Sequence, residues 1–292
     1  MSEAAPIAAI VTAYRRLPDT LRTLQRILDC QPPPHEVLVH VDANQTAIAE
    51  GIAASFPQAK VLVTRENIGP GGARNKLIAA CKAPYVASFD DDSYPCDRDY
   101  FGRVVALFDR HPTAGVLAAR VFHRTEEITD SSGLMPQWVD TFPGGGCAYR
   151  RDVFLATAGY VPLAVAYGME EVDLSIRLID CGTGILHTPS LRVFHDTDLS
   201  RHADPEVTAW SIANIALLAY LRYPGSYCWL GAAQLASRVL WLVKAGRLRG
   251  ILRGLALIPR HLSAHRHYRA TVSVAGLVRA RELRRRPQPV VR

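Results

Sequence analysis

Short apolar segments alternate with longer helix-like segments along the first half of the chain, and this alternation sets narrow limits on the architecture. The apolar, largely β-branched runs are IAAIVT (7–12), EVLVHV (36–41), AKVLV (59–63) and PYVASF (84–89). Runs of this length and composition predict buried strands of a parallel sheet. The intervals between them, such as LPDTLRTLQRIL (17–28), have apolar residues at helical spacing. The order predicts β-α-β units, with ligands bound where the strands end.

The pattern continues to about residue 200 and then changes. GVLAARVFH (115–123) predicts a further strand, EEVDLSIRLIDCG (170–182) a helix closed by Gly182, and GILHTPSLRVFH (184–195) one or two strands. We therefore expect residues 1–202 to form one α/β domain. Beyond residue 203 the composition becomes apolar and helix-favouring, which predicts a mainly helical C-terminal region over 203–292.

Positive charge is concentrated in that C-terminal region. The net charge is +7, and residues 238–292 contain 14 Lys and Arg residues against one acid, Glu282. Such a segment attracts polyanions, either an anionic membrane surface or nucleic acid, unless it is simply a solvated tail. In a continuous 238–260 helix, four arginines would share one face, as in interfacial helices: Arg238, Arg249, Arg253 and Arg260. The uncharged intervals are too short to span a bilayer.

Cysteine usage and the N-terminus bear on the compartment. The six cysteines are scattered and include no C-x-x-C pair, which favours reduced thiols. The segment MSEAAPIAAIVTAY lacks the basic region and cleavage site of a secretory signal. We therefore expect a mature, cytoplasmic chain, held peripherally at the inner face of the cell membrane if the basic region binds lipid.

Three successive carboxylates, Asp90, Asp91 and Asp92, stand where the fourth predicted strand ends. Adjacent like charges repel, so the cluster requires a positive partner. The hard cations Mg²⁺ and Mn²⁺ bind one or two carboxylates together with substrate phosphates. The cluster therefore predicts a divalent metal site, the alternative being that Asp92 and Ser93 merely cap a following helix.

A glycine-rich segment, RENIGPGGARNKL (65–77), precedes the cluster and runs into a predicted helix. Glycines let the backbone approach an anion closely, and a helix N-terminus presents free N–H groups to phosphate. The spacing matches neither the P-loop nor the dinucleotide-binding fingerprint. It therefore favours a different kind of nucleotide site.

Six segments in order carry a family resemblance: VTAYRR, VHVDANQ, NIGPGGARN, SFDDDSYP, PGGGCAYRRDVF and YGMEEVDLSIRL. Together, over roughly residues 7–200, they resemble the family 2 glycosyltransferases of the GT-A fold, such as rhamnosyl- and galactofuranosyltransferases. The resemblance implies an α/β, Rossmann-like GT-A domain that binds a nucleotide sugar, followed by the basic helical extension. It also implies inverting transfer of a sugar from a UDP- or dTDP-linked donor to an acceptor hydroxyl.

The same resemblance implies roles for particular residues. The donor site would consist of Thr12, Ala13, Tyr14, Asp42, Asn67, Gly72, Arg74, Asn75, Asp90 and Asp91. Within it, Asp42 would accept a hydrogen bond from a pyrimidine ring. Asp92, with His195 as a further ligand, would hold Mg²⁺ or Mn²⁺ on the diphosphate.

Catalysis and acceptor binding are implied for the later motifs. Glu171 would be the general base, with Glu170 as the alternative, because a helix start favours the ionised carboxylate. Glu171 stands where this family usually has Asp. Asp173 would brace the site or pair with Arg177, four residues on. Sugar or acceptor contacts would involve Trp138, Gly145 and Gly146.

The partners remain broadly defined at this level. The acceptor could be a glycan, a lipid-linked molecule or a natural-product aglycone, whereas nucleic acid is disfavoured. A sugar-phosphate nucleotidyltransferase is an alternative, but it would carry glycines directly after its first strand, and TAYRRLPDT has none. A non-catalytic polyanion-binding protein is another, and its binding would need neither metal nor Asp92.

Overall fold

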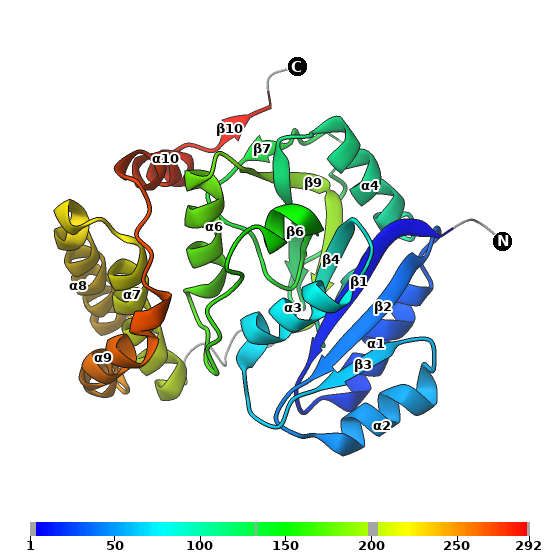
Figure 1. The fold of residues 1–292 in the computed structure, drawn as a ribbon, viewed down its shortest axis with the longest axis horizontal. Coiled ribbons are helices and arrows are strands. Elements are labelled where there is room, and N and C mark those ends of the chain that lie inside the picture. Colours follow the sequence, from blue (N-terminus) through cyan, green and yellow to red (C-terminus); the bar gives the residue numbers. More distant parts are fainter. Residues whose placement is uncertain (1–3, 132, 198–203, 291–292) are drawn as a thin grey trace.

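The computed structural model describes residues 4–131, 133–197 and 204–290 (Figure 1). The strands are β1 (Ala5–Ala13), β2 (Pro34–Val41), β3 (Lys60–Val63), β4 (Tyr85–Asp90), β5 (Ser93–Pro95), β6 (Ala114–His123), β7 (Gln137–Trp138), β8 (Cys147–Arg150), β9 (Gly184–His195) and β10 (Gln288–Pro289). The α-helices are α1 (Leu17–Leu28), α2 (Thr46–Ser55), α3 (Gly69–Ala80), α4 (Tyr100–Arg110), α5 (Arg151–Leu155), α6 (Glu170–Asp180), α7 (Pro205–Arg222), α8 (Cys228–Lys244), α9 (Ile251–His265) and α10 (Val274–Arg285).

One mixed sheet forms the centre of the molecule. Its strand order is β10-β7-β9-β6-β8-β4-β1-β2-β3, and β5 pairs with β9. The four strands β1 to β4 are parallel, as the β-α-β pattern predicted. β8 runs antiparallel between β4 and β6, and β9 lies parallel to β6. The carboxyl ends of β1, β2 and β4 therefore meet at one edge of the sheet.

The predicted strands and the 170–182 helix are confirmed, with ends shifted by a few residues. The segment 184–195 forms the single strand β9 rather than two. Helix α4 begins at Tyr100, so the alternative in which Asp92 and Ser93 cap a helix is wrong. The reason is a tertiary pairing: Ser93 begins β5, which pairs antiparallel with the end of β9 at His195.

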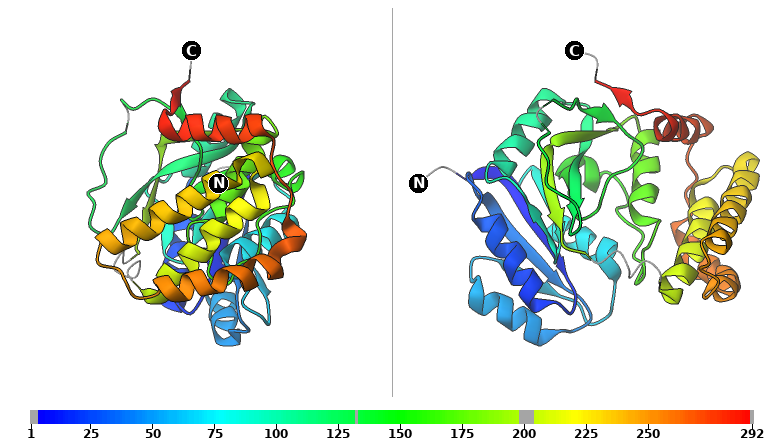
Figure 2. Two further views of the ribbon diagram at one scale, coloured as in Figure 1. Left: turned by 90° about the vertical axis from the view of Figure 1, so that its left-hand side faces the viewer. Right: turned by 180° about the vertical axis from the view of Figure 1, so that it is seen from behind.

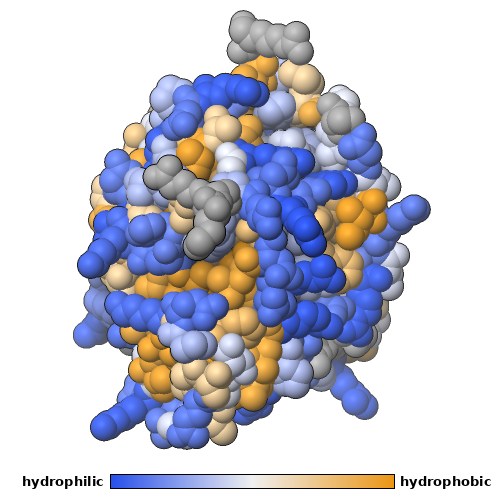
Figure 3. Space-filling view, turned by 90° about the vertical axis from the view of Figure 1, so that its right-hand side faces the viewer, coloured by the Kyte–Doolittle hydropathy of each residue, from blue (hydrophilic) through white to orange (hydrophobic). Residues whose placement is uncertain are grey.

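Two apolar clusters cover the two faces of the sheet. One contains side chains from α1 and α4, such as Leu24, Phe101 and Phe108. The other contains side chains from α3 and α6 together with α7 and α10, such as Leu77, Leu174 and Leu221. The helices α7 to α10 form a layer outside α6 (Figure 1, Figure 2). Seen from the opposite side, the surface is largely hydrophilic with hydrophobic areas between (Figure 3).

The C-terminal region is helical, as predicted, but the continuous 238–260 helix is wrong. α8 ends at Lys244 and α9 begins at Ile251. Between them, Gly246 and Gly250 have φ values of 70° and 94°, a left-handed backbone that ends a helix. The four arginines therefore do not share one helical face. The expected domain boundary at residues 202 and 203 falls outside the described residues.

Two further expectations concern the membrane and the thiols. Across the described ranges, no helix combines the length and the apolar content that crossing a bilayer requires. All six cysteines are described and free, and Cys181 and Cys228 are exposed.

Candidate active site

A cavity of about 510 Å³ opens where β1, β2 and β4 end. Its wall is completed by the N-terminus of α6 and by the end of β9. The predicted site residues that line it are Thr12, Ala13, Tyr14, Asp42, Asn67, Arg74, Asp90, Asp91, Asp92, Glu170, Glu171 and His195. Residues far apart in the sequence are thus brought together around one cavity. The volume of this cavity is typical of small-ligand sites.

The acid cluster is held by the first loop. Thr12 and Asp90 are paired across the parallel strands β1 and β4, and the Thr12 hydroxyl donates to Asp90 Oδ1 at 3.2 Å. The backbone N–H of Tyr14 donates to Asp91 Oδ2 at 3.2 Å. Because both strands end at this edge, the carboxylates face the cavity from the floor of the site.

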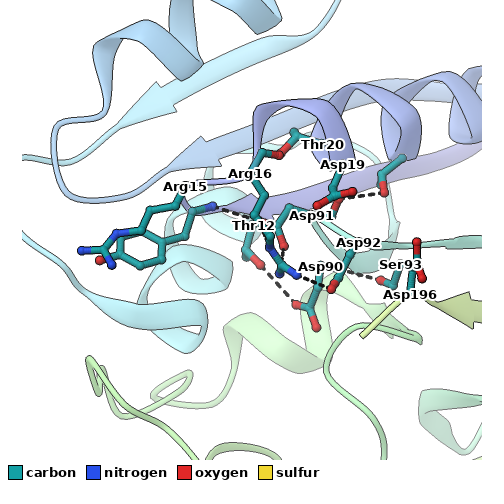
Figure 4. Close-up of polar contacts among 12 residues, drawn as sticks. Thr12, Arg15, Arg16, Asp19, Thr20, Asp90, Asp91, Asp92, Ser93 and Asp196 are labelled. Atoms are coloured by element: carbon teal, nitrogen blue, oxygen red, sulfur yellow. Dashed lines mark hydrogen bonds and ion pairs between the residues drawn. The ribbon is translucent and has the colours of Figure 1, made fainter. Parts of the chain in front are cut away.

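Arg16 supplies a positive charge to the cluster that was not anticipated. Its guanidinium forms ion pairs with both Asp91 and Asp92, whose side chains are almost fully buried (Figure 4). The expectation that a divalent metal alone compensates the three carboxylates is therefore corrected. AYRR marks a basic residue beside the strand, but the sequence does not indicate which acid it reaches.

Asp92 and His195 are close enough to ligate one divalent cation, and in this structure the two Asp92 oxygens are bonded to His195 and Arg16. Asp92 Oδ1 lies 3.1 Å from His195 Nε2, and Asp90 Oδ2 lies 3.9 Å from the same nitrogen. Burial alone would raise the pKa of Asp92, but the hydrogen bond and charge of His195 and the charge of Arg16 hold it below its usual value. Within the described residues no three His, Cys, Asp or Glu side chains form a complete metal centre. One or two protein ligands are enough when substrate phosphates provide the others.

Arg74 is the central cation of the site and is 2% exposed. Its Nε donates to the Ser88 hydroxyl at 3.1 Å, Nη2 pairs with Asp90, and Nη1 lies 3.5 Å from Glu170 Oε2. Burial disfavours the charged form, but Asp90, the two buried tyrosines Tyr149 and Tyr160, and Glu170 together raise the pKa of Arg74. Arg74 thus connects the acid cluster to the first turn of α6.

Glu170 and Glu171 both lie in that first turn, but they differ in burial and in hydrogen bonding. Glu170 is buried, and its Oε1 accepts a hydrogen bond of 2.8 Å from the Gly71 N–H. Burial and the adjacent Glu171 charge raise the pKa of Glu170 to about 8, and burial also raises the pKa of Glu171. Glu171 is half-buried and lines the cavity. It is therefore the better placed of the two to meet an acceptor hydroxyl.

Asp42 is positioned by the glycine-rich segment. Its carboxylate accepts hydrogen bonds from the Gly69 N–H at 2.9 Å, the Ile68 N–H at 3.1 Å and the Thr64 hydroxyl at 2.9 Å. These contacts fix the loop that leads into α3. Asp42 also lines the cavity, so the expected contact with a pyrimidine ring stays a prediction.

Five predicted site residues do not line the cavity, and three of them, Gly72, Asn75 and Trp138, contact neighbouring elements of the protein. The Asn75 amide exchanges hydrogen bonds of 2.9 and 2.8 Å with the Tyr160 backbone, and Gly72 packs against Ile68. Trp138 packs on Gly184, where β7 pairs with β9. The expected donor contacts of Gly72 and Asn75 and the expected sugar or acceptor contact of Trp138 therefore stay predictions.

The glycine run before β8 does not line the cavity, but its backbone lies close to side chains of the site. A Cβ at Gly144 would collide with Glu171 and Arg74, and one at Gly145 would collide with Asp90. Gly146 packs on Val121, away from the carboxylates. Gly145 and Gly146 do not line the cavity, so their expected acceptor contacts stay a prediction. The missing side chain of Gly145 leaves the space that Asp90 occupies.

Some lining residues escaped sequence reasoning. The segment 164–168 forms one wall, and its first three residues, Ala164 to Ala166, precede the YGMEEVDLSIRL motif and belong to no motif themselves. His40 also lines the cavity, and burial lowers its pKa. Neither His40 ring nitrogen has a hydrogen-bond partner within the described chain. Its place inside the predicted strand VLVHV was the one available signal.

Asp173 is buried in the first turn of α6, and its expected ion pair with Arg177 is confirmed. It forms an ion pair with Arg177 at 2.7 Å and a second, fully buried pair with Arg222 of α7. Arg222 also donates to the backbone oxygens of Tyr268 and Ala270, at 2.8 and 3.2 Å. One buried carboxylate thus joins α6 to the C-terminal helices.

Several solved structures have similar folds at low sequence identity. The mannosyltransferase PcManGT from Pyrobaculum calidifontis, in complex with GDP-Man and Mn²⁺, has a TM-score of 0.59 and 14% identity, over 96% of this chain and 79% of that one. S. aureus TarS 1-349, in complex with UDP-GlcNAc, has a TM-score of 0.57 and 16% identity, over 82% and 72%. GalNAc-T7 with UDP, GalNAc and Mn²⁺ has a TM-score of 0.62 and 13% identity, over 91% and 58%.

The sequence comparisons identify the family. No curated protein sequence matches the chain. The family model described as "Glycosyl transferase family 2" matches residues 8–156, which are just over half of the chain and include the acid cluster, the glycine-rich segment and Arg74. The protein therefore belongs to glycosyl transferase family 2 and is a glycosyltransferase with the GT-A fold.

Proposed function

We propose that the protein transfers a hexosyl or rhamnosyl unit from a nucleoside-diphosphate sugar to an acceptor hydroxyl, with inversion at the sugar carbon. The observation that carries the proposal is the convergence of two carboxylate sets in one cavity: Asp90 to Asp92 with His195, and Glu170 with Glu171. The first set suits a metal-bound diphosphate, and the second suits a base. UDP- and dTDP-linked donors remain the first candidates, and the GDP-Man complex of PcManGT adds GDP.

The protein groups divide the work by position. Asp92 and His195 would hold Mg²⁺ or Mn²⁺, which when bound neutralises charge on the departing diphosphate. The loop fixed by Asp42 and the first loop after β1 would bind the nucleoside. Glu171 would take the proton of the acceptor hydroxyl, and Arg74 would keep Asp90 and Glu170 oriented. A single base acting in a single displacement gives inversion.

Donor binding that depends on metal and on Asp92 is the first expected result. UDP, dTDP and GDP would be titrated by calorimetry into the wild-type protein and into Asp92→Ala, with and without Mn²⁺. We expect at least one nucleotide to bind with Mn²⁺ and to lose about tenfold or more in affinity in the variant, because the carboxylate no longer holds the cation. Asp19→Ala, an exposed acid outside the cavity, is the control. Binding indifferent to both changes would instead favour the polyanion-binding alternative.

The rate of transfer is expected to fall with decreasing pH, with an apparent pKa above the ordinary value of a glutamate. A raised pKa keeps Glu171 protonated, and so inactive as a base, until the pH exceeds that pKa. The kcat/KM should therefore rise with pH through a limb whose apparent pKa belongs to the coupled glutamate pair. A profile measured at saturating Mn²⁺ would show it. A limb near the unperturbed value of about 4.3 would contradict the prediction.

We also propose that the C-terminal helices attach the enzyme to an anionic membrane surface on the cytoplasmic side. Trp229, Leu248 and Leu252 are 65%, 62% and 81% exposed, which is unusual for such large apolar side chains. Arg247, Arg249 and Arg253 lie in the same region of the chain. Exposed apolar side chains beside basic ones suit the interface of an anionic bilayer.

A further inference from the structure

A second cavity lies between the C-terminal helices and α6, and no role has been assigned to it. Its volume is about 840 Å³. We call it the helical groove, and its apolar lining comes from α6, α7, α8 and α10: Val172, Ile176, Ile215, Leu218, Leu230, Trp241, Leu277 and Ala280. These helices lie on the side of the molecule away from α1 and α2 (Figure 1, Figure 2). The lining is suited to an aliphatic chain.

Four arginines line the same groove: Arg238, Arg281, Arg284 and Arg285. Asp140 is the one acid among the described lining residues. Within the described part of the chain, none of the four guanidinium groups forms a salt bridge. Arg238 Nε is moreover buried without a hydrogen-bond partner among the described residues. Arg238 also donates to the Ser211 hydroxyl at 3.3 Å and lies over the Trp241 ring. Guanidinium groups without a salt bridge around an apolar cavity favour an anionic ligand, and their planar geometry suits phosphate oxygens.

The groove is adjacent to the active site. Tyr167 and Gly168 line both cavities. Helix α6 is their common wall, since Glu170 and Glu171 line the active site whereas Val172 and Ile176 line the groove. A molecule held in the groove would therefore end beside the proposed base.

We propose, on the basis of the proposed function, that the helical groove binds the acceptor, and that the acceptor is a membrane lipid with a phosphate or diphosphate group. The apolar chain lies against α7 and α8, the phosphate contacts the arginines of α10, and the end that receives the sugar passes Tyr167 toward Glu171. The exposed apolar side chains of α8 and α9 favour a membrane lipid over a soluble aglycone. They let the chain pass between bilayer and groove without crossing water.

Farnesyl diphosphate is a suitable probe, because it joins an apolar chain to a diphosphate and contains no sugar. Calorimetric titration into the full-length protein should show binding, whereas inorganic diphosphate and the uncharged farnesol should each bind at least about tenfold more weakly. Saturating UDP with Mn²⁺ should leave the binding unchanged. Equal binding of inorganic diphosphate, or displacement by the nucleotide, would place the probe in the donor site and overturn the proposal.

Matched variants test the two halves of the groove separately. Arg281→Gln with Arg284→Gln should weaken the binding of farnesyl diphosphate at least about tenfold, whereas Arg279→Gln with Arg286→Gln, in α10 and at its C-cap but outside the groove, should not. Ala233→Trp should block the chain by filling the groove, and Ala232→Trp, its exposed neighbour outside the groove, should not. Equal effects within either matched pair would overturn the assignment.

Nucleotide binding separates this proposal from the proposed function. All four variants should keep the thermal transition of the wild type and its Mn²⁺-dependent nucleotide affinity, which shows that the donor site is intact. Normal nucleotide binding without any binding of farnesyl diphosphate would overturn the groove proposal alone. Failure of the wild-type protein to bind any nucleotide would overturn the proposed function instead.

Discussion

Glu171→Gln is expected to lower the rate of sugar transfer by about 10²- to 10⁴-fold, the usual contribution of a general base. The amide keeps the size of the side chain but cannot accept the proton of the acceptor hydroxyl. Because Glu171 lines the cavity beside Gly144 without holding the donor loop, nucleotide affinity should stay unchanged. Single-turnover rates at saturating donor, together with calorimetry of the nucleotide, measure the two quantities.

Glu170→Gln provides the contrast within the same turn of α6. Glu170 accepts the Gly71 N–H and faces Arg74, so its variant should disturb the donor loop and lower the thermal stability of the protein. Both effects would accompany any loss of rate. If Glu171→Gln kept its activity while Glu170→Gln lost only the chemical step, Glu170 would be the base and the assignment would be reversed.

Arg222→Ala is expected to lower the free energy of unfolding by about 3–5 kcal/mol, the range found when one partner of a buried ion pair is removed. Arg222 and Asp173 are 3% and 0% exposed, so the variant leaves a carboxylate buried without this partner. It also removes the hydrogen bonds to Tyr268 and Ala270. Urea unfolding followed by circular dichroism measures the change.

Arg253→Ala is the matched control from the same helical layer. Arg253 and Glu206 are 61% and 57% exposed and 3.8 Å apart, so this pair should contribute about 0–1 kcal/mol. A similar loss in both variants would show that burial of the Arg222 pair has no particular effect. If the unfolding curve of Arg222→Ala divided into two transitions, the C-terminal helices would unfold separately from the rest once Arg222 no longer joins them.

The sequence was most informative where the physical signal is local. The runs that became β1 to β4 are apolar because both faces of a parallel sheet are covered, and the acids after them mark strand ends. Most residues implied by the resemblance line the cavity for the same reason, since their motifs follow the strands that end there. Gly72, Asn75 and Trp138 do not line the cavity, which their motifs could not indicate because a motif does not show which way a side chain points.

The chain's periodicity was sufficient to predict the α/β sheet, the resemblance of its ordered motifs implied the GT-A class, and its composition and charge distribution predicted the basic helical extension. Only the tertiary structure decided that Arg16 pairs with Asp91 and Asp92, that Arg222 reaches Asp173, and that α6 lies between two adjacent cavities. Periodicity and capping act over a few residues and can be read along the chain. Ion pairs and cavities join residues tens to hundreds of positions apart, and they exist only once the packing of the elements has placed those side chains together.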